Sequence, residues 1–334
     1  MGGSSYRCAH CEQDHFAWHS CNHRLCPLCG AGETKQWVAD QLEKRLPVEH
    51  FLVTFTLPSS LRALCRREAK AFLSAFFATS SQAIKDVLKQ PRHLGGECGF
   101  IGVLQTWTQD LRLHPHIHYI VPAVAIDAKG KLKFPRKAGW LARGEVFASR
   151  MRTLLLKSLE KVGHLSKSDA RVLWKSKWNC DVESFGDGTN AIKYLGGYLK
   201  RGPISDSRIR GETVDSILIA IRDRDTEEEK TFAIEKAEFV RRYLQHALPR
   251  GFHAIRYYGI LHSRSREKIL QIRELLGIRL EAKTKEKHQD EQTPPPRCPR
   301  CRKPMEMTGQ LSRAPPWERT IPRIWTRKQR RSAA

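Results

Sequence analysis

Apolar residues recur along this chain with two periods, and each period predicts a different kind of secondary structure. Positions three or four apart predict helices over residues 33–45, 59–88, 144–162, 168–178 and 238–248. Short apolar runs predict strands over 51–57, 99–107, 113–126 and 180–185, and a hairpin at 217–221 and 231–234. Because a turn with Asp110 and Arg112 joins 99–107 to 113–126, we expect these two strands to pair antiparallel. The mixture predicts an α+β fold.

Three histidines alternate with larger residues along the strand predicted at 113–121. Successive side chains of a strand point to opposite faces, so His114, His116 and His118 share one face and the apolar residues share the other. The Cα atoms of His116 and His118 would lie roughly 6.6 Å apart, which is close enough for both side chains to bind one metal ion. His114 and Gln105 are candidate third ligands. The alternative is a half-buried strand whose polar face meets water, but three histidines in register favour a metal site.

Cysteine pairs near the start of the chain predict a structural zinc site. Cys8 and Cys11 form one C-x-x-C pair and Cys26 and Cys29 form another, separated by fourteen residues. Six of the ten cysteines lie in such pairs and no export signal precedes them, which favours reduced thiolates in the cytoplasm over disulfides. The residues that could replace one ligand are Cys21, His19 and His23. A third pair, Cys298 and Cys301, supplies only half of the ligands of a zinc site. Either other residues complete that site, or the pair is a remnant of one.

A segment with two tyrosines is predicted to be helical at 191–200. Tyr194 and Tyr198 are four residues apart, so on a helix they share a face. Gly196 and Gly197 between them are poor helix formers, and close approach of a nucleic-acid backbone would account for them. The flanking residues that could neutralise phosphates are Lys193, Lys200 and Arg201. The alternative is two core tyrosines on an amphipathic helix.

Charge and composition indicate the partner and the domain boundaries. Lys and Arg outnumber Asp and Glu by 59 to 35, which points to a polyanion and above all to nucleic acid. The longest apolar runs are far too short to span a membrane, so we expect no membrane association. Composition shifts to Lys, Glu, Gln and Pro after about 280. We therefore expect a zinc-binding domain at 1–46, a catalytic domain at 47–280, and a basic, mostly disordered tail at 281–334.

Together the histidine strand and the tyrosine pair suggest phosphoryl transfer to a tyrosine. A divalent ion, Mg²⁺ or Mn²⁺, would polarise the scissile phosphate, and a tyrosine hydroxyl would attack it. The resulting ester conserves the bond, so rejoining to another strand needs no ATP.

These motifs, in this order, resemble the rolling-circle insertion-sequence transposases of the two-tyrosine, IS91-like kind, with their HUH motif of two histidines around one apolar residue. The resemblance covers residues 8 to about 262. Its motifs are the N-terminal cysteines, 114–118, Tyr194 with Tyr198, 239–246, and 251–259. It implies an antiparallel sheet with the HUH strand central and the tyrosine helix across it. It also implies a 5′-phosphotyrosine intermediate on single-stranded DNA, recognition of hairpin-forming transposon ends, and a target DNA.

The basic residues within the shared downstream motifs are further candidate DNA contacts: Arg241, Arg242, His253 and Arg256. Location in the bacterial cytosol or nucleoid would follow from this function. Three alternatives stay open. One is a plasmid replication initiator or relaxase with the same chemistry, and another is a non-catalytic, zinc-dependent nucleic-acid-binding protein. The third, a zinc hydrolase, is disfavoured because no general-base carboxylate accompanies the histidines.

Overall fold

The structure is a computed structural model that describes residues 2–19, 21, 23, 25, 26, 31–199, 202–223, 226–278 and 295–312. The chain forms two compact units. The smaller unit combines Met1–Asn22 with Glu281–Ala334, and the larger one is His23–Leu280. The predicted α+β class is confirmed by both helices and antiparallel sheets in the described residues.

A helix that could cross a membrane is not found anywhere in the described part of the chain.

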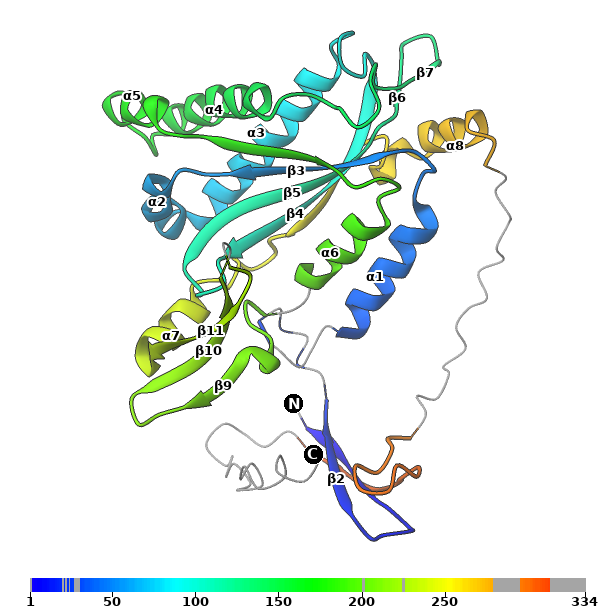
Figure 1. The fold of residues 1–334 in the computed structure, drawn as a ribbon, viewed down its shortest axis with the longest axis vertical. Coiled ribbons are helices and arrows are strands. Elements are labelled where there is room, and N and C mark those ends of the chain that lie inside the picture. Colours follow the sequence, from blue (N-terminus) through cyan, green and yellow to red (C-terminus); the bar gives the residue numbers. More distant parts are fainter. Residues whose placement is uncertain are drawn as a thin grey trace. The chain divides into compact units, whose positions relative to one another are not determined.

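The larger unit is built on a seven-stranded antiparallel sheet (Figure 1). The strand order is β7-β6-β4-β5-β3-β8, and β12 also pairs with β4. The strands are β3 (His50–Thr56), β4 (Glu97–Trp107), β5 (Leu113–Pro122), β6 (Ala125–Ile126), β7 (Leu132–Lys133), β8 (Asn179–Ser184) and β12 (Ile255–Gly259). The histidine strand is β5. It lies between β4 and β3, which confirms its central place and its antiparallel pairing with 99–107.

One face of the sheet is covered by α3 (Ala69–Leu88) and α4 (Gly144–Lys161), with α5 (Lys167–Lys175) beyond them (Figure 1). The apolar alternate residues of β5 point to this face, and Ile117, Tyr119 and Val121 are fully buried there. The ring of Tyr119 meets Phe55 edge-on, and its hydroxyl lies 2.7 Å from Ser80 Oγ. This layer is the main core, and it fixes which face of β5 carries the histidines.

The helix predicted over 59–88 is divided into three parts. They are the 3₁₀ turn η1 (Ser59–Leu61), α2 (Arg62–Arg67) and α3. The break lies at Glu68, whose φ of −119° and ψ of 43° are not helical. The break lets α2 take a direction of its own near the start of β5.

The opposite face is covered by α1 (Ala31–Lys44) and α6 (Thr189–Leu199), which lie side by side (Figure 1). Ile192 and Leu195 of α6 are buried against Ile101 and Ile120 of the sheet. A Cβ on Gly196 would lie 2.3 Å from Val38 Cγ2 of α1, so only glycine allows this approach of the two helices. Helix α8 (Arg266–Leu275) and the 3₁₀ turn η3 (Ser263–Ser265) follow β12.

A smaller layer of the larger unit holds the turn that precedes β5. It consists of η2 (Asp206–Arg208), β9 (Ile209–Glu212), β10 (Ser216–Arg222), β11 (Glu229–Glu235) and α7 (Lys236–Leu244). Strands β10 and β11 confirm the predicted hairpin. Ile219 and Ile234 are buried together with Leu111 from the turn before β5. The layer therefore supports the segment that leads into the histidine strand.

The smaller unit is a three-stranded antiparallel sheet of order β13-β1-β2. Its strands are β1 (Gly3–Arg7), β2 (Asp14–Trp18) and β13 (Glu306–Leu311). The sequence predicts a mostly disordered tail at 281–334, but 295–312 is folded and pairs with β1. The expected boundary at residue 46 also differs, because α1 belongs to the larger unit. No local sequence pattern predicts a strand pairing between residues about 300 positions apart.

Candidate active site and metal centres

The side chains of His116 and His118 face the same way on β5 and lie close together. Their ring centroids are 4.9 Å apart, with the rings nearly perpendicular. Nδ1 of His116 lies 2.7 Å from the backbone oxygen of His114, and a carbonyl can only accept, so Nδ1 carries the proton. Nε2 is therefore the ring nitrogen of His116 that would bind a metal, as is usual when the other ring nitrogen donates to a carbonyl.

His118 is buried and held from both neighbouring strands. Its Nδ1 lies 2.9 Å from Thr54 Oγ1 on β3, and its Nε2 lies 3.3 Å from Gln105 Oε1 on β4. Burial and, to a smaller extent, the neighbouring His116 together lower the pKa of His118 to about 3. A neutral imidazole has a lone pair to offer, which a metal ligand requires.

Of the two candidate third ligands, Gln105 lies beside His118, whereas His114 is bonded elsewhere. Nη2 of Arg62 lies 3.1 Å from His114 Nδ1, so the guanidinium donates to that lone pair. No third His, Cys, Asp or Glu gathers with these histidines among the described residues. The imidazoles of His116 and His118 with the amide oxygen of Gln105 form a donor set that fits Mn²⁺ or Mg²⁺.

Tyr194 stands at the edge of this group. Its ring lies edge-on to His118 with the centroids 5.9 Å apart, and 43% of its surface is exposed. Helix α6 buries Ile192 and Leu195 on the sheet, which leaves Tyr194 on the flank that faces the histidines. A core role for Tyr194 is therefore wrong. Tyr198 follows one turn later on α6, and its side chain lies outside the described part of the structure, as do Cys29, Lys200 and Arg201.

Arg62, the first residue of α2, is a site residue that no sequence pattern indicated. It is half-buried, and its Nε is buried without a hydrogen-bond partner. The described residues also place no carboxylate in an ion pair with it. A half-buried guanidinium is costly unless an anion joins it. Its position beside the histidine row suits a phosphate oxygen.

Several predicted DNA contacts have structural partners instead. Arg241 and Arg242 both bond to the carboxylate of Glu238, and Arg242 also donates to the Asp110 backbone oxygen at 2.9 Å. Arg256 stacks on the ring of Phe77 at 4.3 Å. By contrast, Lys193 and His253 are exposed. Sequence position alone could not separate these two groups.

The turn before β5 is strained and is held by α7 and the residues that follow it. Leu111 is buried with a φ of 63°, in the left-handed region that side chains rarely adopt. Its carbonyl accepts from Gln245 Nε2 at 2.8 Å and from His246 Nε2 at 3.0 Å. Thr106 Oγ1 lies 3.1 Å from His246 Nδ1, which then accepts. Burial lowers the pKa of His246 to about 4, so this ring is neutral.

The smaller unit brings four cysteines together. The sulfurs of Cys8, Cys11, Cys298 and Cys301 all lie within 4.8 Å of one another, and the closest pairs are 3.5 Å apart. A disulfide would need about 2.05 Å, whereas zinc with Zn–S bonds of about 2.3 Å spaces its tetrahedral sulfurs by roughly 3.8 Å. The backbone N–H of Cys301 lowers the pKa of the Cys298 thiol to about 6, which favours a thiolate. The cluster fits structural zinc.

Two matching loops build this cluster. In each, the first cysteine donates its N–H to the residue five places on, from Cys8 to Gln13 and from Cys298 to Lys303. Each loop also places a left-handed residue directly after its second cysteine, with a φ of 53° at Glu12 and 60° at Arg302. Both C-x-x-C pairs therefore form the same kind of metal-binding turn.

The ligand set of this cluster differs from the one expected at Cys8, Cys11, Cys26 and Cys29. The pair Cys298 and Cys301 completes the site, so it is not a lone remnant. Cys21 and Cys26 take no part in a group of three or more ligands among the described residues. The fourteen-residue spacing is typical of zinc sites, but a strand pairing far away in sequence decides the outcome.

Comparisons with known proteins identify the family of the chain. Residues 99–268 match a family described as "Putative transposase", and residues 1–57 match a transposase zinc-binding domain. The chain is 32% identical over 302 residues to "Putative transposase y4qJ" of Sinorhizobium fredii, covering 84% of this chain and 76% of that relative. It is 29% identical over 284 residues to the transposase for insertion sequence element IS801 of Pseudomonas savastanoi pv. phaseolicola, covering 79% and 67%. No solved structure matches the chain.

Proposed function

Since the chain belongs to the IS91-like, two-tyrosine transposases with a zinc-binding domain, and acts on DNA, we propose that it cuts and rejoins single-stranded DNA through a 5′-phosphotyrosine intermediate. The observation that carries the proposal is the position of Tyr194 against His118, at a ring distance of 5.9 Å. In this arrangement the nucleophile and the metal-binding histidines can act on the same phosphate. The reaction moves an element by the rolling-circle route.

In the proposed step the hydroxyl oxygen of Tyr194 attacks the scissile phosphorus. The bond from this oxygen to phosphorus forms, and the bond from phosphorus to the 3′ oxygen of the leaving strand breaks. The tyrosine loses its proton and the leaving oxygen gains one, so the strand departs with a 3′ hydroxyl. Attack by another 3′ hydroxyl on the ester reverses these bonds and joins a new strand. Tyr198 would hold a second end or act in sequence with Tyr194.

His116, His118 and Gln105 would hold the catalytic Mg²⁺ or Mn²⁺. That ion supplies Lewis-acid polarisation of the phosphate and orients it for in-line attack. Arg62 binds a further phosphate oxygen and keeps it beside His114, which its guanidinium already contacts at 3.1 Å. Thr54 fixes the ring of His118 from the neighbouring strand. These residues position the phosphate in front of Tyr194.

A covalent-adduct experiment tests the proposal. Labelled single strands that tile both flanks of the gene are incubated with protein and Mn²⁺ or Mg²⁺, and products are separated on a denaturing gel. Wild type should retain the 3′-labelled fragment covalently and release a 5′-labelled fragment with an extendable 3′ hydroxyl. Tyr194→Phe together with Tyr198→Phe should give no adduct.

Tyr6→Phe is the matched control, because Tyr6 lies on β1 of the smaller unit and is not among the residues that the proposal places at the phosphate. It should form adduct as wild type does. An adduct that persists in the double tyrosine variant would refute the nucleophile. Binding without an adduct, by wild type on cleavable ends, would favour the alternative of a non-catalytic zinc-dependent DNA-binding protein.

A further inference from the structure

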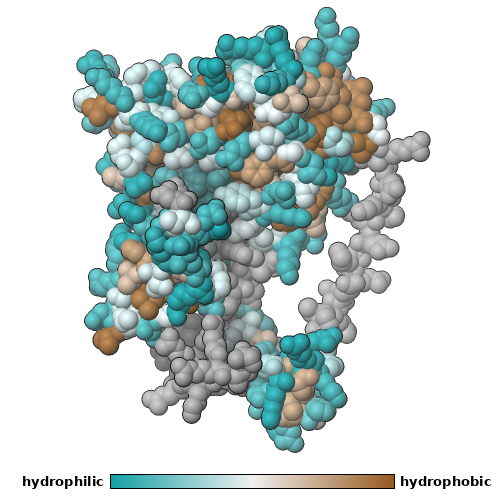
Figure 2. Space-filling view, viewed as in Figure 1, coloured by the Kyte–Doolittle hydropathy of each residue, from teal (hydrophilic) through white to brown (hydrophobic). Residues whose placement is uncertain are grey.

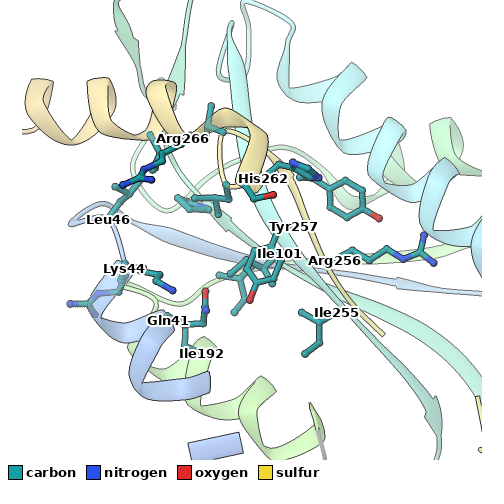
Figure 3. Close-up of a pocket in the computed structure, with 18 of the residues that line it drawn as sticks. Gln41, Lys44, Leu46, Ile101, Ile192, Ile255, Arg256, Tyr257, His262 and Arg266 are labelled. Atoms are coloured by element: carbon teal, nitrogen blue, oxygen red, sulfur yellow. The ribbon is translucent and has the colours of Figure 1, made fainter. Parts of the chain in front are cut away.

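A cavity of about 1220 Å³ lies in the larger unit between α1, α8 and the sheet (Figure 3). Its volume exceeds the range of about 300–1,000 Å³ that is usual for small-molecule sites. Residues from β4, β5, β12 and α6 form an apolar and aromatic floor: Ile101, Ile120, Ile192, Ile255 and Tyr257. Hydrophobic residues also gather on the visible surface in the region of α8 (Figure 2). The cavity is large enough for a segment of a polymer.

The rim of this cavity is basic, and none of the described residues that line it is acidic. Lys44 and Arg266 lie on the same side of it, one from α1 and one from α8 (Figure 3). Neither has an ion pair with a carboxylate among the described residues. Arg45 and Arg273 also line the cavity, but Arg45 pairs with Asp187, and Arg273 donates to the backbone oxygen of Lys44 at 2.7 Å.

The floor continues directly from the candidate active site. Ile120 comes two residues after His118 on β5, so both side chains project from the same face of the sheet. Ile255 pairs with Val103, which in turn pairs with His118. A chain bound in the cavity would therefore run along the sheet face into the histidine row.

From these observations we infer that the cavity binds the single DNA strand that adjoins the scissile phosphate. This inference rests on the proposed function and adds a second contact region to it. Bases pack on Ile255 and Tyr257, the half-buried residues of the floor, and Trp37 Nε1 donates to the Tyr257 hydroxyl at 2.9 Å. Phosphates meet Lys44 and Arg266. An apolar and aromatic floor with a basic rim is the usual arrangement for binding single strands without reading their sequence.

The test uses the full-length chain carrying Tyr194→Phe and Tyr198→Phe, so that cleavage does not disturb binding. The probes are fluorescein-labelled dT30 and a 30-base-pair duplex, followed by fluorescence anisotropy over a range of salt concentrations. Lys44→Glu with Arg266→Glu should weaken dT30 binding at least tenfold. It should also lower the slope of log Kd against log salt by about 1.4, since each phosphate contact on a single strand contributes about 0.7.

Lys167→Glu with Arg264→Glu is the matched control, because both residues are exposed, outside the cavity, and subject to the same charge change. It should leave affinity and slope unchanged, and the charge-retaining pair Lys44→Arg with Arg266→Lys should bind as the parent does. A dT30 probe containing 5-iodouracil should crosslink under ultraviolet light to the peptide that contains Tyr257.

An unchanged slope in the cavity variant, an equal loss for duplex and single strand, or crosslinks only outside the cavity would overturn the inference. The covalent-adduct experiment tests the tyrosine chemistry independently of the cavity. An adduct from wild type with cavity-independent binding would reject the cavity alone. Cavity-dependent binding without any adduct would reject the tyrosine chemistry alone.

Discussion

Thr54 Oγ1 lies 2.9 Å from His118 Nδ1, on the strand beside the histidine row. Such an outer partner orients a metal-binding imidazole, and its loss typically weakens metal affinity about 10–100-fold. We predict this loss for Thr54→Val in a Mn²⁺ titration followed by electron paramagnetic resonance. Thr56→Val is the matched control, since Thr56 lies on the same strand but stands opposite His116 and not opposite His118. Equal weakening by both variants would show that Thr54 does not act through His118.

Arg62 should contribute to the reaction itself. Removing one donor that stabilises developing charge typically slows a reaction about 10²–10³-fold. Arg62→Gln should therefore slow adduct formation by about 10²-fold in single-turnover experiments, and Arg62→Lys should restore only part of the rate because it lacks the forked geometry. Arg66→Gln, an exposed neighbour on α2, should leave the rate unchanged. A normal rate in Arg62→Gln would remove this residue from the site.

The two glycines of α6 should respond in opposite ways to alanine. A Cβ on Gly196 would collide with Val38, and overpacking of this kind costs about 1–3 kcal/mol. A Cβ on Gly197 would meet nothing within 4 Å, so the better helix propensity of alanine should stabilise by up to about 1 kcal/mol. Urea unfolding measures both changes. If Gly197→Ala is stable but binds DNA more weakly, a nucleic-acid backbone approaches at this residue.

His246 should make stability depend on pH. Burial lowers its pKa to about 4 in the folded chain, below about 6.5 in the unfolded chain. The unfolded state therefore binds more protons between these values, and stability falls as pH falls from about 6.5 towards 4. The contribution of His246 to the loss at pH 5 should be about 2 kcal/mol relative to pH 7.5. Urea unfolding at both pH values should show a smaller loss for His246→Gln and the full loss for His164→Gln.

The zinc cluster should depend on cysteines from both parts of the smaller unit. Cys298→Ser with Cys301→Ser should remove one zinc ion per chain, measured by mass spectrometry of the metal content, because each cysteine supplies one of four thiolates. Cys180→Ser, a half-buried cysteine outside the cluster, should keep the full zinc content. If the pair at 298 and 301 could be lost without loss of zinc, the metal would be held by other cysteines.

Local patterns were sufficient to predict the central sheet and the central place of the histidine strand in it. The alternation around His116 and His118 predicts which face of β5 is buried, and a short turn predicts its pairing with β4, which places Gln105 beside His118. Arg62 could not be predicted, because its role depends on the break at Glu68 and on packing against β5.

The zinc ligands show the limit of spacing arguments. Cys26 has the expected separation from Cys11, yet Cys298 and Cys301 complete the cluster because β13 pairs with β1. Likewise, Arg241 and Arg242 could be recognised as basic but not as partners of Glu238, since three-dimensional neighbours decide how a charge is used. Chemistry is predictable where its residues are close in sequence.

The cysteine cluster also sets an order of events during protein synthesis. Cys11 and Cys298 are 287 residues apart, so the first metal-binding turn leaves the ribosome long before its partner. The whole larger unit is synthesised after Cys11 and before Cys298. It can therefore fold before the second pair of cysteines has been translated. A chain that stops early, through a frameshift or a nonsense codon, never completes the four thiolates. The cluster therefore forms only in chains translated at least as far as Cys301, and copies of the gene truncated before that codon yield proteins without an assembled smaller unit.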